Sequence, residues 1–348
     1  MSLADYLKNR LEMYCFLKDP GPKVPYMPAN IYIEPTNVCN LNCVLCARET
    51  LRREKGILKL ADFKRIIDQF ASCNWYAPVT LVGNGEPTMN KAIIPMIEYA
   101  KHKGFYVSMI SNSTLLDEER TERILHSGLD RYQTMFDSLD RTSYEKLRTG
   151  ASYDKVKKNI ISLIRRNEEL GHPVFISIGL VDTSLTKNKK ETEAYWRSLS
   201  IDNFYRAPLL SFATDSGLYA EAMKIKKGKR SGKCSAAFTD IFICWNGDVK
   251  LCPVDFNDHW IVGHIFRSSI AEIWNGSRAQ RMRKALLQGD TAFFKSCGLR
   301  CDQCNAPYVE DYTIAGHRAS IPVRIEREVR AFYIKPLKNP DCRKKKKS

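Results

Sequence analysis

Short apolar strands alternate with amphipathic helices through the middle of this chain, and the alternation limits the folds open to it. The spacing of apolar residues predicts strands over 31–34, 79–82, 106–110, 132–136, 174–180 and 203–205. It predicts helices over 60–70, around 93–100, and over 117–126, 156–164 and 189–198. Six such units predict a parallel sheet with outer helices. Because six units cannot close an eight-stranded barrel, we expect an α/β fold of the open, partial (βα)6 TIM-like barrel type.

Three cysteines follow the first predicted strand. Cys39, Cys43 and Cys46 have the spacing C-x3-C-x2-C. Three thiolates on one loop can hold three corners of a cubic iron–sulfur cluster, which leaves one iron without a protein ligand. An open coordination position distinguishes a catalytic metal site from a closed structural one. A zinc knot or a set of structural thiols is the alternative that the spacing alone leaves open.

Other polar and small residues lie at the same edge of the predicted sheet. Cys39, Gly85, Ser111, Asp137 and Val181 all fall at or just past the end of a predicted strand. The chemistry of parallel α/β folds is located at the carboxyl ends of the strands. The sequence therefore predicts one site at this edge, with the three thiols in it.

The length and composition of the chain indicate how many domains it has and in which cellular setting it is expected. A chain of 348 residues suits one large domain and a smaller one. No run of about 18 apolar residues occurs, so no transmembrane helix is expected. The N-terminus lacks the pattern of a secretory signal, and we expect a cytoplasmic location. Twelve cysteines in such a chain indicate metal ligands rather than disulfides.

The formal net charge is +16. A basic field attracts nucleic acids, anionic membranes and acidic substrates. Part of the charge lies in the terminal run 343–347, which is typical of a solvated tail. Because the sequence contains no recognisable nucleic-acid-binding module, we do not expect a nucleic-acid partner from charge alone.

A second group of cysteines follows the predicted barrel. Cys234 and Cys252 flank a hairpin-like segment, 242–251, in which Asn246-Gly247 is a strong two-residue turn signal. Cys297, Cys301 and Cys304 follow later, again as C-x3-C-x2-C. Two distant pairs brought together make a closed four-thiolate site, suited to electron transfer or to structure.

The first cysteine group and its surroundings resemble the radical S-adenosylmethionine (radical SAM) enzymes. The resemblance rests on the cysteine triplet, on 83–87 after the second strand, on 111–116 after the third, and on Asp137–Asp140 with Tyr144, Arg148 and Gly150 after the fourth. It covers roughly residues 28 to 305. Leu45 departs from the pattern, because many members have an aromatic residue before the third cysteine.

This resemblance implies a [4Fe-4S] cluster on Cys39, Cys43 and Cys46 that binds S-adenosylmethionine. It implies the following cofactor contacts: Gly83, Gly85 and Glu86 beside the methionine amino group, Ser111 and Asn112 at the ribose or carboxylate, Arg148 at the methionine carboxylate, and Leu180 and Val181 beside the adenine. For Arg148 the alternative is a surface helix charge, and for Leu180 and Val181 it is core packing.

The C-terminal part resembles the SPASM/twitch extensions of these enzymes. Cys234, Cys252, Cys301 and Cys304 match the ligands of one auxiliary [4Fe-4S] cluster, with Gly247 five residues before Cys252. Cys244, Cys297 and Cys342 are left over and would serve a second auxiliary cluster, while a zinc site is a further alternative. We expect Cys15 and Cys73 to be ordinary buried thiols.

Four segments are expected. They are an N-terminal helical lead and linker (1–28), the partial barrel (29–222), the auxiliary cluster domain (223–310), and a C-terminal extension with the basic tail (311–348).

Among radical SAM enzymes, the layout resembles the dehydrogenase of aminocyclitol antibiotic pathways. This likeness implies oxidation of a hydroxyl group on a sugar or aminocyclitol-like small molecule, with the auxiliary cluster as electron acceptor and flavodoxin or ferredoxin as external electron donor. One alternative is an epimerase, for which Cys244 or Cys297 would return a hydrogen atom. Another is a peptide maturase, although only 38 residues precede Cys39. An electron carrier or a zinc scaffold is the non-enzymatic alternative.

Overall fold

The computed structural model describes residues 11–13, 15–17, 19–209 and 234–297. Cys301, Cys304 and Cys342 lie outside these described residues, as does the basic tail. In the described part of the N-terminal lead, residues 11–13 and 15–17 are helical, as predicted.

Within the described ranges, nine strands form one curved sheet in the order β6-β5-β4-β3-β2-β1-β7-β8-β9. Strands β1 to β6 are parallel neighbours, which confirms the predicted α/β partial barrel. Their bounds are β1 Asn30–Ile33, β2 Val79–Leu81, β3 Val107–Ser111, β4 Arg131–Met135, β5 Phe175–Asp182 and β6 Asn203–Pro208.

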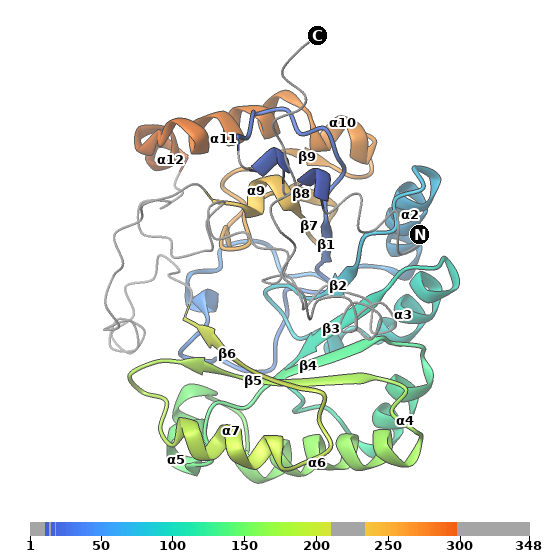
Figure 1. Cartoon of the computed structure of the whole chain (residues 1–348), viewed down its shortest axis with the longest axis vertical. Coiled ribbons are helices and arrows are strands. Elements are labelled where there is room, and N and C mark those ends of the chain that lie inside the picture. The colour runs from blue at the N-terminus through green and yellow to red at the C-terminus, as the bar shows by residue number, and fades with distance from the viewer. Residues whose placement is uncertain (1–10, 14, 18, 210–233, 298–348) are drawn as a thin grey trace.

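Helices cover the outer face of this sheet (Figure 1). They are α2 Leu60–Ser72, α3 Ile93–His102, α4 Glu118–His126, α5 Arg141–Leu147, α6 Tyr153–Glu169 and α7 Lys189–Arg197. Two short 3-10 helices, η1 Ala47–Thr50 and η2 Pro87–Met89, lie in the loops that follow Cys46 and Glu86. Side chains cap several of the α-helices. Asp117 accepts from the Arg120 amide at the start of α4, and Ser152 accepts from the Lys155 amide at the start of α6. The apolar spacing did not predict α5, because it is only seven residues long and begins at an Asp140 cap.

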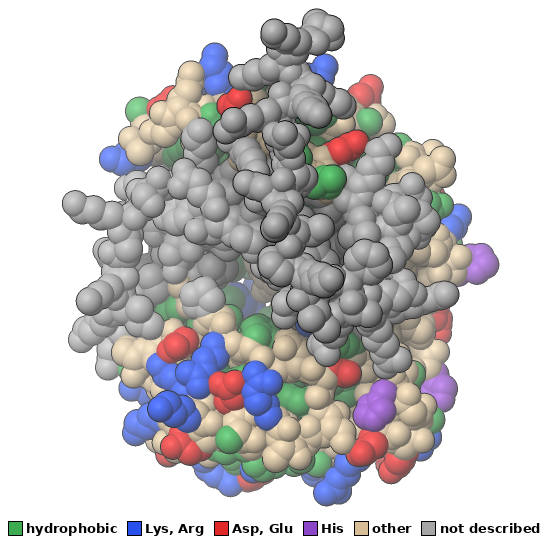
Figure 2. Space-filling view, in the orientation of Figure 1, with side chains coloured by type: hydrophobic (Ala, Val, Ile, Leu, Met, Phe, Trp, Pro, Cys, Tyr) green, Lys and Arg blue, Asp and Glu red, His purple; other side chains and the backbone are tan. Residues whose placement is uncertain are grey.

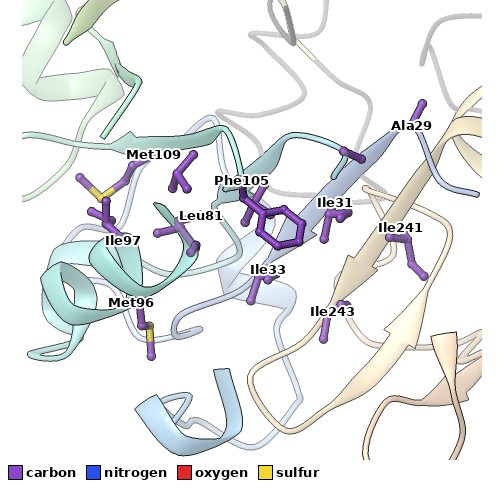
Figure 3. Packing of buried hydrophobic residues seen from close by; sticks show 14 of the residues in the cluster. Ala29, Ile31, Ile33, Leu81, Met96, Ile97, Phe105, Met109, Ile241 and Ile243 are labelled. Atoms are coloured by element: carbon purple, nitrogen blue, oxygen red, sulfur yellow. The ribbon is translucent and has the colours of Figure 1, made fainter. Parts of the chain in front are cut away.

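The core lies between the sheet and these helices, and the first strand shows how its residues divide between the two faces. In β1, Ile31 and Ile33 are fully buried, whereas Tyr32 between them is half-buried on the inner face. Figure 3 shows Ile31 and Ile33 with Leu81, Ile97 and Met109 of the neighbouring elements. Burying one such aliphatic side chain contributes about 1.5–3 kcal/mol.

The hairpin that follows Cys234 extends the barrel sheet. Strand β7 (Asp240–Ile243) pairs in parallel with β1, and β8 (Asp248–Lys250) and β9 (Gly263–His264) continue antiparallel. Helices α9 (Ala236–Thr239), α10 (Ile270–Trp274), α11 (Ser277–Gln288) and α12 (Thr291–Ser296) pack at this end. The cysteine-bearing segment therefore shares one hydrogen-bonded sheet with the barrel.

The hairpin was predicted, but its turn lies one residue earlier than the Asn246-Gly247 signal suggested. The Gly247 amide donates to the Cys244 carbonyl at 2.9 Å, so Trp245 and Asn246 are the central residues. Gly247 follows with φ of +94°. A three-residue loop with glycine in this left-handed position is a common hairpin connection.

Charges on the described surface are mixed in sign. Figure 2 shows Lys and Arg side chains interspersed with Asp and Glu over the lower part of the molecule. The ion pairs among the described residues include Arg141 with Asp154 and Lys189 with Asp182. In the part of the chain that the structure describes, no helix is long and apolar enough to cross a membrane.

Candidate active site

The loop with the three thiols follows β1 and lies at the carboxyl edge of the sheet. Each of Cys39, Cys43 and Cys46 is half-buried. Two backbone hydrogen bonds hold the loop. The Asn42 amide donates to the Thr149 carbonyl at 2.9 Å, and the Val44 amide donates to the Leu147 carbonyl at 3.0 Å. These backbone hydrogen bonds, together with the burial of Leu41 and Leu45, therefore set the path of this loop.

The three thiols are electrostatic neighbours. Burial raises the pKa of the Cys43 thiol, and the Arg148 guanidinium opposes that rise while the Cys39 thiol adds to it. Burial, together with the Cys43 and Cys39 thiols, raises the pKa of Cys46 to about 11. Neighbouring thiolates that repel one another favour a bound cation or a cationic cluster.

The donor set fits an iron–sulfur cluster. Cys39, Cys43 and Cys46 are soft thiol ligands carried by one loop, and thiolates on such short spacings suit these clusters.

Glu86 joins the loops that follow β2 and β3. It is 2% exposed, and its carboxylate accepts from Ser111 Oγ and the Asn112 amide at 2.7 Å each and from Thr88 Oγ1 at 2.6 Å. Its own amide donates to the Val38 carbonyl at 2.9 Å. Glu86 therefore braces the strand ends against the thiol loop, a contact set that sequence reasoning missed.

Close packing explains why glycine occupies positions 83 and 85, just before Glu86. A Cβ on Gly85 would lie 2.4 Å from the Thr36 carbonyl oxygen and 2.5 Å from that of Val38. A Cβ on Gly83 would lie 2.4 Å from Glu34 Cγ. The close approach that requires glycine here is to the backbone and side chain of the segment after β1.

Arg148 is paired and largely shielded, with 15% of its side chain exposed. Its Nε donates to Asp137 Oδ2 at 2.6 Å, and the other oxygen of that fully buried carboxylate accepts from the Val181 amide at 2.8 Å. The alternative of a surface helix charge is therefore wrong. Asp137, which sequence reasoning placed in a motif without a role, orients Arg148 toward Cys43.

The two residues proposed beside the adenine differ in placement. Val181 packs with Leu185 against a small apolar cluster of Leu45, Leu147 and Leu209, near the thiol loop. Leu180 is fully buried in the main core instead, because alternate strand residues point to opposite faces. The expectation that Leu180 faces a ligand is therefore corrected in favour of core packing.

Among the later cysteines, Cys234, Cys252 and Cys297 are half-buried. Cys244 is 1% exposed, and its thiol donates to Asp258 Oδ1 at 3.7 Å. Burial raises the pKa of Cys244, so it remains a thiol at neutral pH. A hydrogen donor must reach its substrate, and this burial disfavours that role for Cys244. Cys297 follows α12 at the edge of the described residues.

The expectation that Cys15 and Cys73 are ordinary buried thiols is wrong for Cys73 and only partly right for Cys15. Cys73 is exposed, because it follows the last turn of α2 and points away from the core, and Cys15 is half-buried.

Two family models match this chain. Residues 33–181 match the radical SAM superfamily, and residues 234–305 match SPASM, described as an iron–sulfur cluster-binding domain.

Curated relatives match in part. The chain is 27% identical over 186 residues to a tungsten-containing aldehyde ferredoxin oxidoreductase cofactor-modifying protein of Pyrococcus furiosus, which is 52% of this chain and 51% of that protein. It is 34% identical over 149 residues to a probable GTP 3′,8-cyclase of Pyrococcus abyssi, which is 43% of this chain and 46% of that protein. The chain thus spans about half the length of these curated relatives.

Solved structures with a similar fold match a larger share of this chain than the curated relatives do. BtrN in complex with AdoMet and 2-DOIA has a TM-score of 0.54 at 18% identity, over 82% of this chain and 98% of that one. AnSMEcpe with bound AdoMet has a TM-score of 0.62 at 16% identity, over 88% and 100%. Streptococcus suis SuiB has a TM-score of 0.59 at 18% identity, over 74% and 68%. At such identities the likeness shows a shared fold.

The first family match implies a [4Fe-4S] cluster with S-adenosylmethionine, and the second implies auxiliary iron–sulfur clusters. The thiol loop at the carboxyl edge of an open barrel is where such a cluster is expected. The chain therefore contains a radical SAM domain, matched over residues 33–181, and a SPASM iron–sulfur cluster-binding domain, matched over residues 234–305.

Proposed function

We propose that Cys39, Cys43 and Cys46 hold a [4Fe-4S] cluster at which S-adenosylmethionine is cleaved reductively. The observation that carries this proposal is the gathering of three mutually interacting thiols beside Arg148 at the carboxyl ends of parallel strands. When bound, the cluster and S-adenosylmethionine supply a 5′-deoxyadenosyl radical that removes a hydrogen atom from the substrate.

The chain's own residues bind and orient. Arg148, fixed by Asp137, provides a cation beside Cys43, where the methionine carboxylate of the cofactor would approach. Gly83, Gly85 and Glu86 keep the loop after β2 tight against the thiol loop. Ser111 ends β3 and Asn112 follows it, and both donate to Glu86. Val181 and Leu45 offer an apolar wall for the adenine.

The reaction we favour is a two-electron oxidation of a hydroxyl group on a sugar or aminocyclitol-like molecule. Cys234, Cys252, Cys301 and Cys304 would hold an auxiliary cluster that accepts the electron left after hydrogen abstraction, while the hydroxyl proton passes to solvent. Support comes from the coverage of 98% of BtrN, whose structure contains AdoMet and the small molecule 2-DOIA. An external donor such as flavodoxin or ferredoxin would reduce the first cluster.

Peptide modification is the second candidate, and a specific observation favours it. The fold is also similar to that of SuiB bound to precursor peptide SuiA, with a TM-score of 0.55, and of AnSMEcpe bound to the Cp18Cys peptide, with a TM-score of 0.59. An open barrel accepts either class of substrate at the same edge. Of the two candidate donors for epimerisation, Cys297 is the better one, since Cys244 is buried.

The test begins with anaerobic reconstitution and an assay for iron and sulfide. We expect about eight irons per chain, and release of 5′-deoxyadenosine when dithionite and S-adenosylmethionine are added. The Cys252→Ala variant should lose about half of the iron but still release 5′-deoxyadenosine. A wild-type chain that holds iron yet never forms this product would refute the proposal.

A substrate screen then separates the reactions. Aminocyclitols and sugars are incubated with the reconstituted enzyme in heavy water, alongside cysteine- and serine-containing peptides. A ketone product without incorporated deuterium indicates dehydrogenation, an inverted alcohol with deuterium indicates epimerisation, and a mass change in a peptide indicates maturation.

A further inference from the structure

Four charged side chains form a buried network where the barrel meets the hairpin. Arg53 donates to Glu34 Oε1 at 2.7 Å and to Asp258 Oδ2 at 3.0 Å, and Lys250 donates to Asp258 Oδ1 at 2.9 Å. The side chains of Arg53 and Lys250 are 7% exposed, that of Glu34 is 8% and that of Asp258 is 13%. Two positive and two negative charges balance in one enclosed cluster.

These side chains come from segments that carry the two sets of cysteines. Arg53 lies seven residues after Cys46, on the loop that leaves the first site. Lys250 lies at the end of β8, two residues before Cys252, and Asp258 lies six residues after it. Glu34 follows β1, the strand that pairs with β7 and precedes the thiol loop. The network thus links the first cysteine loop directly to the segment around Cys252.

Glu34 extends the link to two further loops. Its Oε1 also accepts from the Asn84 amide at 3.0 Å, in the loop after β2. Its Oε2 accepts from the Trp245 amide at 3.3 Å, in the hairpin turn. The Trp245 ring lies over Gly56, where a Cβ would come within 2.3 Å of it. Both carboxylate oxygens of Glu34 therefore accept hydrogen bonds. The hairpin packs, through Trp245, on the chain that follows the thiol loop.

A network of this kind is a poor source of stability but a good means of fixing an arrangement. Removing two ions from water is expensive, and apolar replacements of buried ion pairs are often neutral or stabilising. Paired directional bonds between fixed donors and acceptors, in contrast, admit few relative positions of the segments that carry them.

We propose that the network of Glu34, Arg53, Lys250 and Asp258 is a positioning device that sets the placement of the auxiliary cluster relative to the S-adenosylmethionine cluster. This inference rests on the proposed function, since it requires both clusters. None of the four residues is a proposed ligand. They act through the loops that carry Cys46 and Cys252.

The test compares the reconstituted wild-type chain with two kinds of variant. The Lys250→Met/Asp258→Asn double substitution removes one charge of each sign, so no unpaired charge is created by the pair itself. Arg53→Gln breaks the network from the side of the first loop, and Arg53→Lys keeps the charge there. The matched control is Arg141→Met/Asp154→Asn, which removes a pair of similar length, 2.6 Å, that is 55% and 66% exposed.

The readout is the microwave power at half-saturation of the electron paramagnetic resonance signal of the reduced S-adenosylmethionine cluster. A nearby second cluster speeds relaxation steeply with decreasing distance. We expect the double variant and Arg53→Gln to keep the wild-type iron content and to lose relaxation enhancement, approaching the Cys252→Ala variant. Arg53→Lys should recover part of it, and the control pair should match the wild type.

The KM for S-adenosylmethionine in abortive 5′-deoxyadenosine formation should be unchanged in the double variant, because Glu34, Arg53 and Asn84 keep their mutual contacts. Unaltered power saturation at full iron content, or loss of a whole cluster from every network variant, would overturn the proposal. So would a wild-type chain with only about four irons, since no second cluster would then need placement. If the wild type holds both clusters but releases no 5′-deoxyadenosine, the proposed function fails while the relaxation result still decides the role of the network.

Discussion

The side-chain amide of Asn112 donates to the thiol sulfur of Cys39, with 3.8 Å between Nδ2 and Sγ. The same amide also donates to Asn40 Oδ1 at 3.0 Å. Asn112 follows β3, and its backbone amide is bonded to the buried Glu86. One hydrogen-bond donor to a prospective cluster ligand is thus held in place by the end of a neighbouring strand.

This contact predicts a shift in reduction potential. Hydrogen bonds to ligand sulfurs and local charge tune the potentials of iron–sulfur clusters, and a donor stabilises the more negative, reduced state. Asn112→Asp removes the donor and adds a negative charge, so we expect the potential of the cluster on Cys39, Cys43 and Cys46 to fall by tens of millivolts. A redox titration followed by electron paramagnetic resonance measures it.

Asn112→Ala, which removes the donor without adding a charge, should give a smaller fall. A rise in potential in the Asp variant would contradict the assigned contact.

Cys43→Ala should abolish 5′-deoxyadenosine formation. Cys43 is the thiol beside Arg148, and its loss leaves two thiols for a cluster that requires three from this loop. We expect the reconstituted variant to lose about four irons relative to the wild type, measured by colorimetric iron assay.

Cys73→Ala is the control for that experiment, because Cys73 is an exposed cysteine on the far end of α2. It should keep the wild-type iron content and cleavage rate. Persistent cleavage by Cys43→Ala would show that the site has been assigned to the wrong thiols.

Gly85→Ala should destabilise the apo chain. Its Cβ would lie 2.4 and 2.5 Å from two carbonyl oxygens of the backbone, which cannot swing aside as a side chain can. Overpacking of this kind costs about 1–3 kcal/mol in the free energy of unfolding, measurable by urea denaturation.

The comparison for Gly85→Ala is Gly21→Ala, where no atom lies within 4 Å of the added Cβ. Its unfolding free energy should stay close to that of the wild type. Equal stability of both variants would mean that the loops after β1 and β2 are not packed as described.

The edge strand β6 should be attached to α7 in a pH-dependent way. Glu193 accepts from Arg197 Nε and from Arg206 Nε, both at 2.9 Å. The hydrogen bond from Arg197 lowers the pKa of this carboxyl, with Arg206 adding to the effect. A carboxyl with a lowered folded-state pKa stabilises the fold above its ordinary pKa, and this contribution is lost as pH falls through the lowered value.

Glu193→Gln removes that titration. The difference in Tm between the wild type and this variant should therefore be largest near neutral pH and should shrink as the pH falls below the ordinary carboxyl range. Because Glu193 and its two arginine partners are partly exposed, high salt should also reduce this difference in Tm. Parallel curves of Tm against pH would contradict the assignment.

Much of the site could be predicted because its residues are close in sequence to strand ends. Cys39, Ser111 and Asp137 could be placed at one edge from strand periodicity alone, since parallel strands bring their carboxyl ends together. The hairpin near Gly247 was predictable for a similar reason, although the turn itself begins one residue earlier.

Other features depend on which residues meet across long separations. The pairing of β7 with β1 joins residues more than two hundred positions apart, and nothing in the local pattern at 240–243 specifies this partner. The exposure of Cys73 and the burial of Cys244 likewise follow from neighbours supplied by other segments.

By itself, the sequence determined the order of the six barrel strands and of the helices between them other than α5, the three thiols on one loop and the edge at which they lie, because each of these depends on local spacing. The tertiary structure alone decided that Glu86 and Asp137 brace other site residues, that Leu180 faces the core, and that Glu34, Arg53, Lys250 and Asp258 meet in one buried network. The physical reason is that burial and hydrogen bonding depend on contacts in space, and charged residues scattered over a chain show no periodicity that predicts such contacts.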